Sequence, residues 1–177
     1  HYLQHKYNLQ PISNGQFSFF RMRPSNFPTI RIAQLVSLYH AHQNLFSKMM
    51  KTATLKGFYE MSEVSVHPFW KTHYTFDKSS KSSPKKLTKQ FVDLLLINTI
   101  IPLKFLYKKH RGEVIENEFL VILQKIKSEK NNIISKFDDI GIKAKNGYDT
   151  QALLELKNNY CTKKLCLHCD LNIFSFS

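Results

Sequence analysis

The sequence predicts a mostly α-helical protein: a single helical domain of about five or six helices around a central, apolar, kinked helix. Apolar residues recur at spacings of three and four in several long stretches, which is the period of a helix face. Typical helix start and stop residues bracket these stretches, and no strand pattern competes with them. The 177 residues, 42% of them hydrophobic, suffice for a substantial core. We expect an N-terminal arm (1–27), a helical domain (28–160), and a cysteine knuckle with a tail (161–177).

The first helix is expected at roughly residues 29–50. The preceding residues contain turn formers, such as Asn14-Gly15, but no sustained period, so they should form an arm that packs on the body. Pro28 suits the first helical turn, because the N–H that proline lacks would be unpaired there. The apolar face of this helix would consist of Ile32, Leu35, Val36, Tyr39, Phe46 and Met50.

An aromatic and histidine-rich stretch, Val66 to Phe76, follows and includes Trp70, the only tryptophan. We interpret it as an aromatic cluster that anchors a long connection, with ligand binding as the alternative. The next segment, Asp77 to Lys86, is a low-complexity loop in which lysines alternate with serines. Such a loop either clamps phosphates or remains a solvated, flexible connection.

The central helix is expected over Leu87 to Tyr107, where apolar residues almost surround the helix axis. Pro102 should kink it, because the proline ring removes a backbone donor and clashes with the carbonyl of Asn98. Asp93 and Asn98 are expected to pair with neighbours. The most apolar part, Phe91 to Leu103, is too short and too polar to span a bilayer, so we expect no membrane partner.

Three shorter helices should complete the domain. The first covers residues 116–126, and the second covers 129–138, with Ser128 as its cap and Gly141 as its stop. The third begins after Asn146-Gly147, with Asp149 or Thr150 as its cap, and leads directly into Cys161.

The chain's three cysteines, Cys161, Cys166 and Cys169, lie within nine residues at C-x4-C-x2-C spacing. Thiolates at this spacing can converge on a zinc ion or an iron–sulfur cluster. His168 is the nearest fourth ligand, and Asp170, His40, His42 and His73 are further candidates. The equally weighted alternative is ordinary reduced thiols. A disulfide is the least favoured, because an odd count leaves one thiol unpaired.

The formal charge of +13 predicts a positive surface that attracts polyanions, nucleic acid first. The expected phosphate contacts are Arg21, Arg23, Arg31, Lys78, Lys81, Lys85 and Lys86. The alternative is that the charge reflects an AT-rich genome, which favours lysine codons. Reduced cysteines and the absence of an export signal point to the cytoplasm.

Four strings together resemble a known family. They are Arg21-Met-Arg-Pro-Ser-Asn-Phe-Pro-Thr-Ile-Arg-Ile-Ala-Gln-Leu35, Trp70-x-x-His73-Tyr-x-Phe76, Asp93-Leu-Leu-Leu-Ile-Asn-Thr-Ile-Ile-Pro102, and Gln151-Ala-Leu-Leu-Glu-Leu-Lys-Asn-Asn-Tyr-Cys161 with the cysteine run. In this order, over nearly all 177 residues, they resemble the C-terminal portion of an uncharacterised bacterial family, domain of unknown function 2851. The resemblance implies no established reaction. It implies that longer members carry an N-terminal region that this chain would lack, in which a Gly-Pro-Asp-Phe string is similar to a nuclease core.

Catalytic motifs are missing from this sequence. It has no phosphate-binding glycine loop, no His-Glu-x-x-His pair and no Gly-x-Ser-x-Gly elbow. The chain alone is therefore not expected to be a complete enzyme, and no catalytic residue is assigned. We expect a nucleic-acid-binding helical module with a structural metal at the cysteines. The alternatives are the scaffold portion of a nuclease-like hydrolase and a protein-interaction scaffold.

Overall fold

The computed structural model describes residues 2–11, 13, 16–113 and 117–169. These residues are mostly α-helical, as predicted, and within them the only β-type pairings are two isolated bridges, His73 with Ser79 and Lys127 with Asn146. The chain divides into two compact units. The first comprises residues 1–45 and 62–87, and the second comprises 46–61 and 88–177. The sequence predicts different boundaries, for an arm, a helical domain and a tail, and these boundaries stay a prediction.

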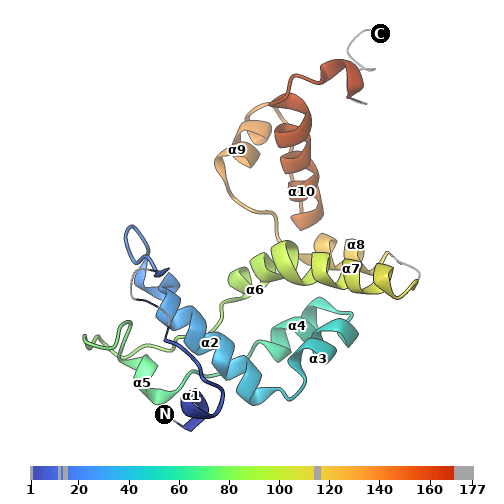
Figure 1. The fold of residues 1–177 in the computed structure, drawn as a ribbon. Coiled ribbons are helices and arrows are strands. Elements are labelled where there is room, and N and C mark those ends of the chain that lie inside the picture. Colours follow the sequence, from blue (N-terminus) through green and yellow to red (C-terminus); the bar gives the residue numbers. More distant parts are fainter. Residues whose placement is uncertain (1, 12, 14–15, 114–116, 170–177) are drawn as a thin grey trace. The chain divides into compact units, whose positions relative to one another are not determined.

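The first unit is built on α2 (Pro28–Ala41), which is drawn in light blue in Figure 1. It also contains α1 (Tyr2–Lys6), a 3-10 turn (Pro24–Asn26) and the short α5 (Pro68–Lys71). Pro28 occupies the first turn of α2, as predicted. The buried apolar residues of the unit are Ile30, Ala33, Leu45, Val64 and Val66.

The helix expected over 29–50 is divided in two. His42 has an extended backbone and Asn44 lies in the left-handed region at φ +56°, so the helix ends at Ala41. A new helix, α3 (Leu45–Lys51), begins directly afterwards. Asparagine tolerates the left-handed conformation better than most residues, because its short side chain can bond locally to the backbone. The apolar period continues across the break, which is why the sequence suggests one helix.

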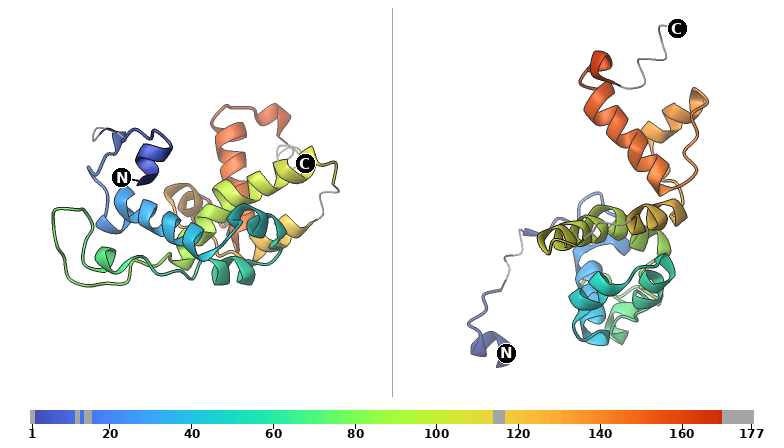
Figure 2. Two further views of the ribbon diagram at one scale, coloured as in Figure 1. Left: turned by 60° about the horizontal axis from the view of Figure 1, so that its bottom comes forward. Right: turned by 90° about the vertical axis from the view of Figure 1, so that its right-hand side faces the viewer.

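The second unit centres on a continuous helix that changes type in its middle. It runs as α6 (Lys89–Leu95), a π-helical turn (Leu96–Ile100) and α7 (Ile101–His110). The π turn lies just before Pro102, where the sequence predicts a kink, and in it the Ile101 N–H donates to the Leu96 carbonyl. The wider turn accommodates the ring of Pro102, and one backbone hydrogen bond is missing because proline has no N–H. Figure 2 shows this helix in yellow-green with α3 and α4 (Leu55–Met61) along one side of it.

This helix is buried on one side instead of all round. Val92, Leu96, Ile97 and Ile101 are buried, whereas Leu106 is 61% exposed. Lys89–His110 is long and apolar enough to cross a membrane on length and composition alone, and the core helices of soluble proteins meet the same two criteria. The expectation of no membrane partner stays a prediction.

The remaining helices match the sequence closely, but their caps differ. They are α8 (Glu118–Lys125), α9 (Asn132–Asp139) and α10 (Gly147–Glu155), and α9 and α10 lie side by side in Figure 1. Asn131, not Ser128, caps α9, and its side chain accepts from the Ile133 and Ile134 N–H groups. Asn146 caps α10 in place of Asp149 or Thr150. Gly141, at φ +85°, follows α9 as the predicted stop.

A buried lysine ties the second unit together. Lys104 on α7 is 1% exposed, and its ammonium group donates to the Thr52 carbonyl at 2.5 Å. The rings of Phe58 and Phe119 lie 5.6 and 6.0 Å from the same nitrogen. Burial lowers the pKa of Lys104, and the nearby Glu118 carboxylate partly opposes this shift. Cations that leave water need such partners, because an unpaired buried charge is very costly.

We predict that Lys104→Ala lowers the free energy of unfolding by about 2–4 kcal/mol, because it leaves a cavity and an unpaired Thr52 carbonyl. Lys109, exposed on the same helix, provides the control, and Lys109→Ala should change stability by less than about 0.5 kcal/mol. Urea denaturation followed by circular dichroism measures both. Equal effects would show that the Lys104 contacts do not stabilise the unit.

Candidate functional site

Most of the basic residues predicted to contact phosphates lie exposed in the first unit. Arg23, Lys78, Lys81 and Lys86 are all exposed. Arg21 is also exposed, adopts a left-handed backbone at φ +59°, and places its guanidinium carbon 5.1 Å from the centre of the Phe20 ring. All these residues belong to one compact unit, in two segments that are far apart in the sequence.

Hydrogen bonds through Gln34 hold these two segments together. The buried side-chain amide of Gln34 donates to the Lys85 carbonyl at 2.9 Å. Its oxygen accepts from Arg31 at 2.9 Å, and Arg31 also donates to the Asn26 side chain at 2.6 Å. Partial burial lowers the pKa of Arg31, which still remains a cation at neutral pH. The start of α2 is thus fixed beside the end of the segment Asp77 to Lys86, which is called the basic loop below.

Lys85 differs from the other loop lysines because its ammonium group is buried and hydrogen-bonded inside the unit. It is 5% exposed, and its ammonium group donates to the Lys71 carbonyl at 2.9 Å and to the Ser83 hydroxyl at 2.8 Å. The same nitrogen lies 4.0 Å from the centre of the Tyr74 ring. These contacts anchor the base of the loop, and they leave Lys78, Lys81 and Lys86 as its exposed cations.

The charge balance of the first unit is strongly one-sided. Its sequence contains two carboxylate side chains, Glu63 and Asp77. Against these stand nine cations: Lys6, Arg21, Arg23, Arg31, Lys71, Lys78, Lys81, Lys85 and Lys86. At most two of the nine can be neutralised by carboxylates of the same unit, so the surface carries a net positive potential.

The three cysteines follow the end of α10. A π turn (Leu156–Cys161) extends that helix, so Cys161 is its last residue, as predicted. Cys166 begins a 3-10 turn (Cys166–His168), and its carbonyl accepts from the Cys169 N–H at 3.2 Å. Cys161 and Cys166 are exposed and Cys169 is half-buried, and all three are free thiols.

These thiols are not assembled as a metal site in the described part of the chain. Among those residues, no group of three or more His, Cys, Asp or Glu side chains lies together in a way that could hold a metal ion. His168, His40, His42 and His73 are among the described residues and form no such group, whereas Asp170 lies outside the described residues. The cysteine site therefore stays a prediction of the sequence.

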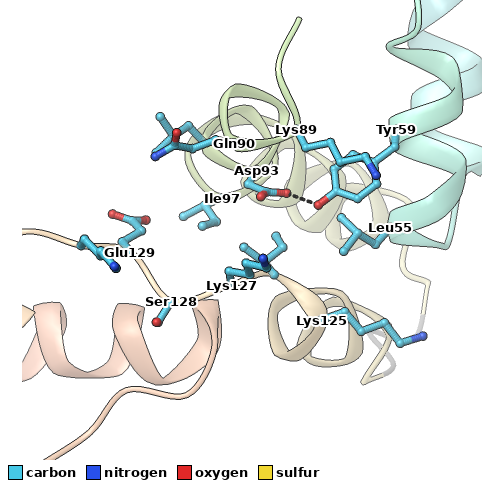
Figure 3. Close-up of a pocket in the computed structure, with 13 residues that line it drawn as sticks. Leu55, Tyr59, Lys89, Gln90, Asp93, Ile97, Lys125, Lys127, Ser128 and Glu129 are labelled. Atoms are coloured by element: carbon cyan, nitrogen blue, oxygen red, sulfur yellow. Dashed lines mark hydrogen bonds between the residues drawn. The ribbon is translucent and has the colours of Figure 1, made fainter.

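The second unit contains a cavity of ≈ 780 Å³ that no sequence motif indicated (Figure 3). Apolar side chains from α4, α6 and the end of α8 form part of its wall. Four lysines and two carboxylates also line it: Lys89, Lys125, Lys127, Lys130, Asp93 and Glu129. The tip of Lys125 points away from Asp93 and Tyr59 in Figure 3. An opening with this lining favours small anionic ligands, since its cations outnumber its carboxylates.

A tyrosine–aspartate pair joins α4 to α6 at this cavity. Tyr59 donates its hydroxyl hydrogen to the Asp93 carboxylate at 2.6 Å, as the dashed line in Figure 3 marks. Burial, followed by the bond to Asp93, raises the pKa of Tyr59. Burial also raises the pKa of Asp93, although the Tyr59 bond and the Lys89 charge oppose this. The expectation that Asp93 and Asn98 pair with neighbours is confirmed, because Asn98 donates to the Leu94 carbonyl at 2.9 Å.

The opposite wall of the cavity is the connection from α8 to α9, and α10 fixes its position. The Gly147 N–H donates to the Ile126 carbonyl at 2.8 Å, and the Glu129 N–H donates to the Thr150 hydroxyl at 3.2 Å. Thr150 is completely buried, so this junction excludes water. The sequence could not reveal the cavity, because it combines residues from three separate segments, 55–59, 89–97 and 125–130.

The comparisons with known proteins add one match. A family model described as Protein of unknown function (DUF2851) matches residues 1–132. The chain belongs to the DUF2851 family. The match covers about three quarters of the chain, which is less than the nearly complete range that the four strings indicated. No curated protein and no solved structure matches the chain.

The DUF2851 match includes the whole first unit and every residue that lines the cavity. It ends at Asn132, the first residue of α9. The string from Gln151 to Cys161, with the cysteines after it, lies beyond the matched range. The family description assigns no activity, so it supports the membership and leaves the function to be argued from the residues.

We predict that Tyr59→Phe lowers the free energy of unfolding by about 1–2 kcal/mol, because the Asp93 carboxylate loses a hydrogen bond. Because the pKa of Tyr59 is higher in the folded state, protonated Tyr59 stabilises the fold fully below the unfolded pKa of about 10. This stabilisation is lost as the pH rises above that value. The stability difference between wild type and Tyr59→Phe should therefore shrink above about pH 10. Urea denaturation of both proteins across this range measures it, and a constant difference would contradict the assignment.

The cysteine spacing makes a separate prediction. Protein purified without oxygen should contain stoichiometric zinc, or iron with a broad visible absorption band, and Cys166→Ser should lose it. Elemental analysis and a visible spectrum of both proteins decide the question. Metal-free protein that stays folded would establish the three cysteines as ordinary thiols.

Proposed function

We propose that this chain binds nucleic acid through the first unit, on a surface formed by Arg21, Arg23, Arg31, Lys78, Lys81 and Lys86. This set is called the basic surface below. The observation that carries the proposal is the charge balance of the unit, with nine Lys and Arg residues against two carboxylates. A genome-wide preference for lysine would also raise the charge of the second unit, but it does not account for so few carboxylates in the first.

The local geometry supports phosphate contact at the start of α2. Arg31 is held by Asn26 and Gln34, so its guanidinium plane has a fixed position. Arginine at a fixed position can offer paired donors to phosphate oxygens. The positive end of the α2 dipole lies at the same place and favours an anion there.

The basic loop supplies the second half of the surface. Lys85 anchors the base of the loop through Lys71 and Ser83, and Lys78, Lys81 and Lys86 are exposed around this anchor. Mobile lysine ammonium groups bind phosphates as point charges without reading the sequence of the bases. The proposed binding is therefore independent of base sequence.

The test is the affinity for labelled DNA, measured by fluorescence anisotropy at increasing salt. The variant Lys78→Gln/Lys81→Gln/Lys86→Gln should bind more weakly than wild type. It should also lower the slope of log affinity against log salt by about 2–3, because each lost contact with duplex phosphate lowers that slope by about 0.9.

A matched control removes the same charge from the second unit. Lys136, Lys143 and Lys145 are exposed there, and their triple replacement by glutamine should leave the slope unchanged. An equal loss in both triple variants would show that net charge, and not the basic surface, determines binding. Binding that does not respond to salt, or no binding, would exclude the proposal and favour a protein-interaction scaffold.

A further inference from the structure

The first unit also carries a group of aromatic rings beside its basic loop, one of them largely exposed. Phe69 and Trp70 on α5 and Phe76 after it form this group, which is called the aromatic step below. The Phe76 ring centre lies 5.2 Å from that of Trp70 and 6.3 Å from that of Phe69. Phe69 in turn stacks on His73 at 4.1 Å with nearly parallel rings. The rings thus support one another.

Phe76 is too exposed for a ring that serves only to anchor the chain. It is 70% exposed, whereas Phe69 and Trp70 are half-buried and make the contacts that an anchor requires. A phenylalanine ring stabilises a fold mainly by being buried away from water. The Phe76 ring remains mostly in water, so it contributes little to the stability of the unit. A flat accessible ring on a supported base is suited to stack with another flat ring.

The loop hydrogen bonds bring cations to this position. The Ser80 N–H donates to the Thr72 carbonyl at 2.7 Å, and the Ser83 N–H donates to the Lys71 carbonyl at 2.9 Å. Lys81 lies between these two serines in the sequence, so its backbone runs beside the end of α5. Lys71 follows Trp70 directly, and both lysines are exposed.

We propose that the aromatic step and the lysines beside it bind single-stranded nucleic acid. A base would stack on Phe76, and Lys71, Lys78 and Lys81 would contact the phosphates on either side. This arrangement of stacking rings within a cationic surface suits unpaired strands, because a duplex keeps its base faces covered. The inference rests on the proposed function and adds the strandedness of the ligand to it.

The test compares labelled oligodeoxyuridylate, oligouridylate and a DNA duplex of equal length at one salt concentration. Wild type should bind at least one of the two single strands more tightly than the duplex. Phe76→Ala should weaken single-strand binding about 5- to 100-fold, since that is the usual effect of removing a stacking ring, and should leave duplex binding unchanged. Phe76→Tyr keeps a ring and should bind like wild type.

Trp70 provides a readout without substitution. It is the only tryptophan, and it lies next to Phe76, so a base stacked there should quench its fluorescence saturably as the oligonucleotide is added. The duplex should quench it less. Tyr148→Ala, which removes an exposed ring from the second unit, controls for general effects of removing a ring.

The outcomes separate the two proposals. If the triple lysine variant loses affinity for every ligand and Phe76→Ala loses none, the basic surface binds nucleic acid and the stacking inference is wrong. Equal loss of single-strand and duplex binding in Phe76→Ala also overturns it. If wild type binds none of the three ligands in a salt-dependent way, both proposals are wrong. A difference between the two single strands identifies DNA or RNA as the ligand.

Discussion

The second unit depends on a cation placed where water does not reach it. The Lys104 ammonium group contacts the end of α3 through Thr52, α4 through Phe58, and α8 through Phe119. One side chain thereby joins three segments to the central helix. On the next turn of α7, Lys108 lies 2.8 Å from the largely buried Glu118 carboxylate, so a negative charge stands close to both lysines. Such an arrangement is stable only if all the partners are present at once, which makes the unit intolerant of small shifts.

Lysines serve two purposes in this chain, and net charge alone does not distinguish them. Lys85 and Lys104 are buried, and each has carbonyl and aromatic partners. Lys78, Lys81 and Lys86 are exposed. The value of +13 therefore overstates the charge that a ligand could meet, while the shortage of carboxylates in the first unit is the more informative number. The potential of a surface depends on where the charges lie, not on their total.

Much of the fold could be predicted from local patterns. The period of the apolar residues located α8, α9 and α10, and Pro28 marked the start of α2. The break at Asn44 was missed because the apolar period continues through it. Caps were misplaced because Ser128, Asp149 and Thr150 all have suitable side chains, and only the backbone decides which residue lies just outside the helix.

The residues of the candidate sites also divide into those that the sequence could identify and those that it could not. Exposed arginines and lysines could be identified from the sequence, because charge usually lies at the surface. The burial of Lys85, the pairing of Tyr59 with Asp93 and the cavity beside them could not be identified. Each depends on contacts between segments that only the folded chain brings together. The exposure of Phe76 belongs to the same group, because aromatic residues are expected inside.

The π turn at Leu96–Ile100 has a consequence for changes in chain length. Such a turn contains one residue more than an α-helix would need, and each residue of an α-helix advances the chain by about 100° around the axis. Deleting a single residue here would restore regular α-helix with α7 in nearly the same rotation relative to α6, because the wide turn absorbs its extra residue. Lys104 would keep its partners. Deleting a residue inside α7, ahead of Lys104, would instead turn Lys104 by that angle, away from them. The π turn is therefore the place in this helix where the chain length can change with the least disturbance of the core.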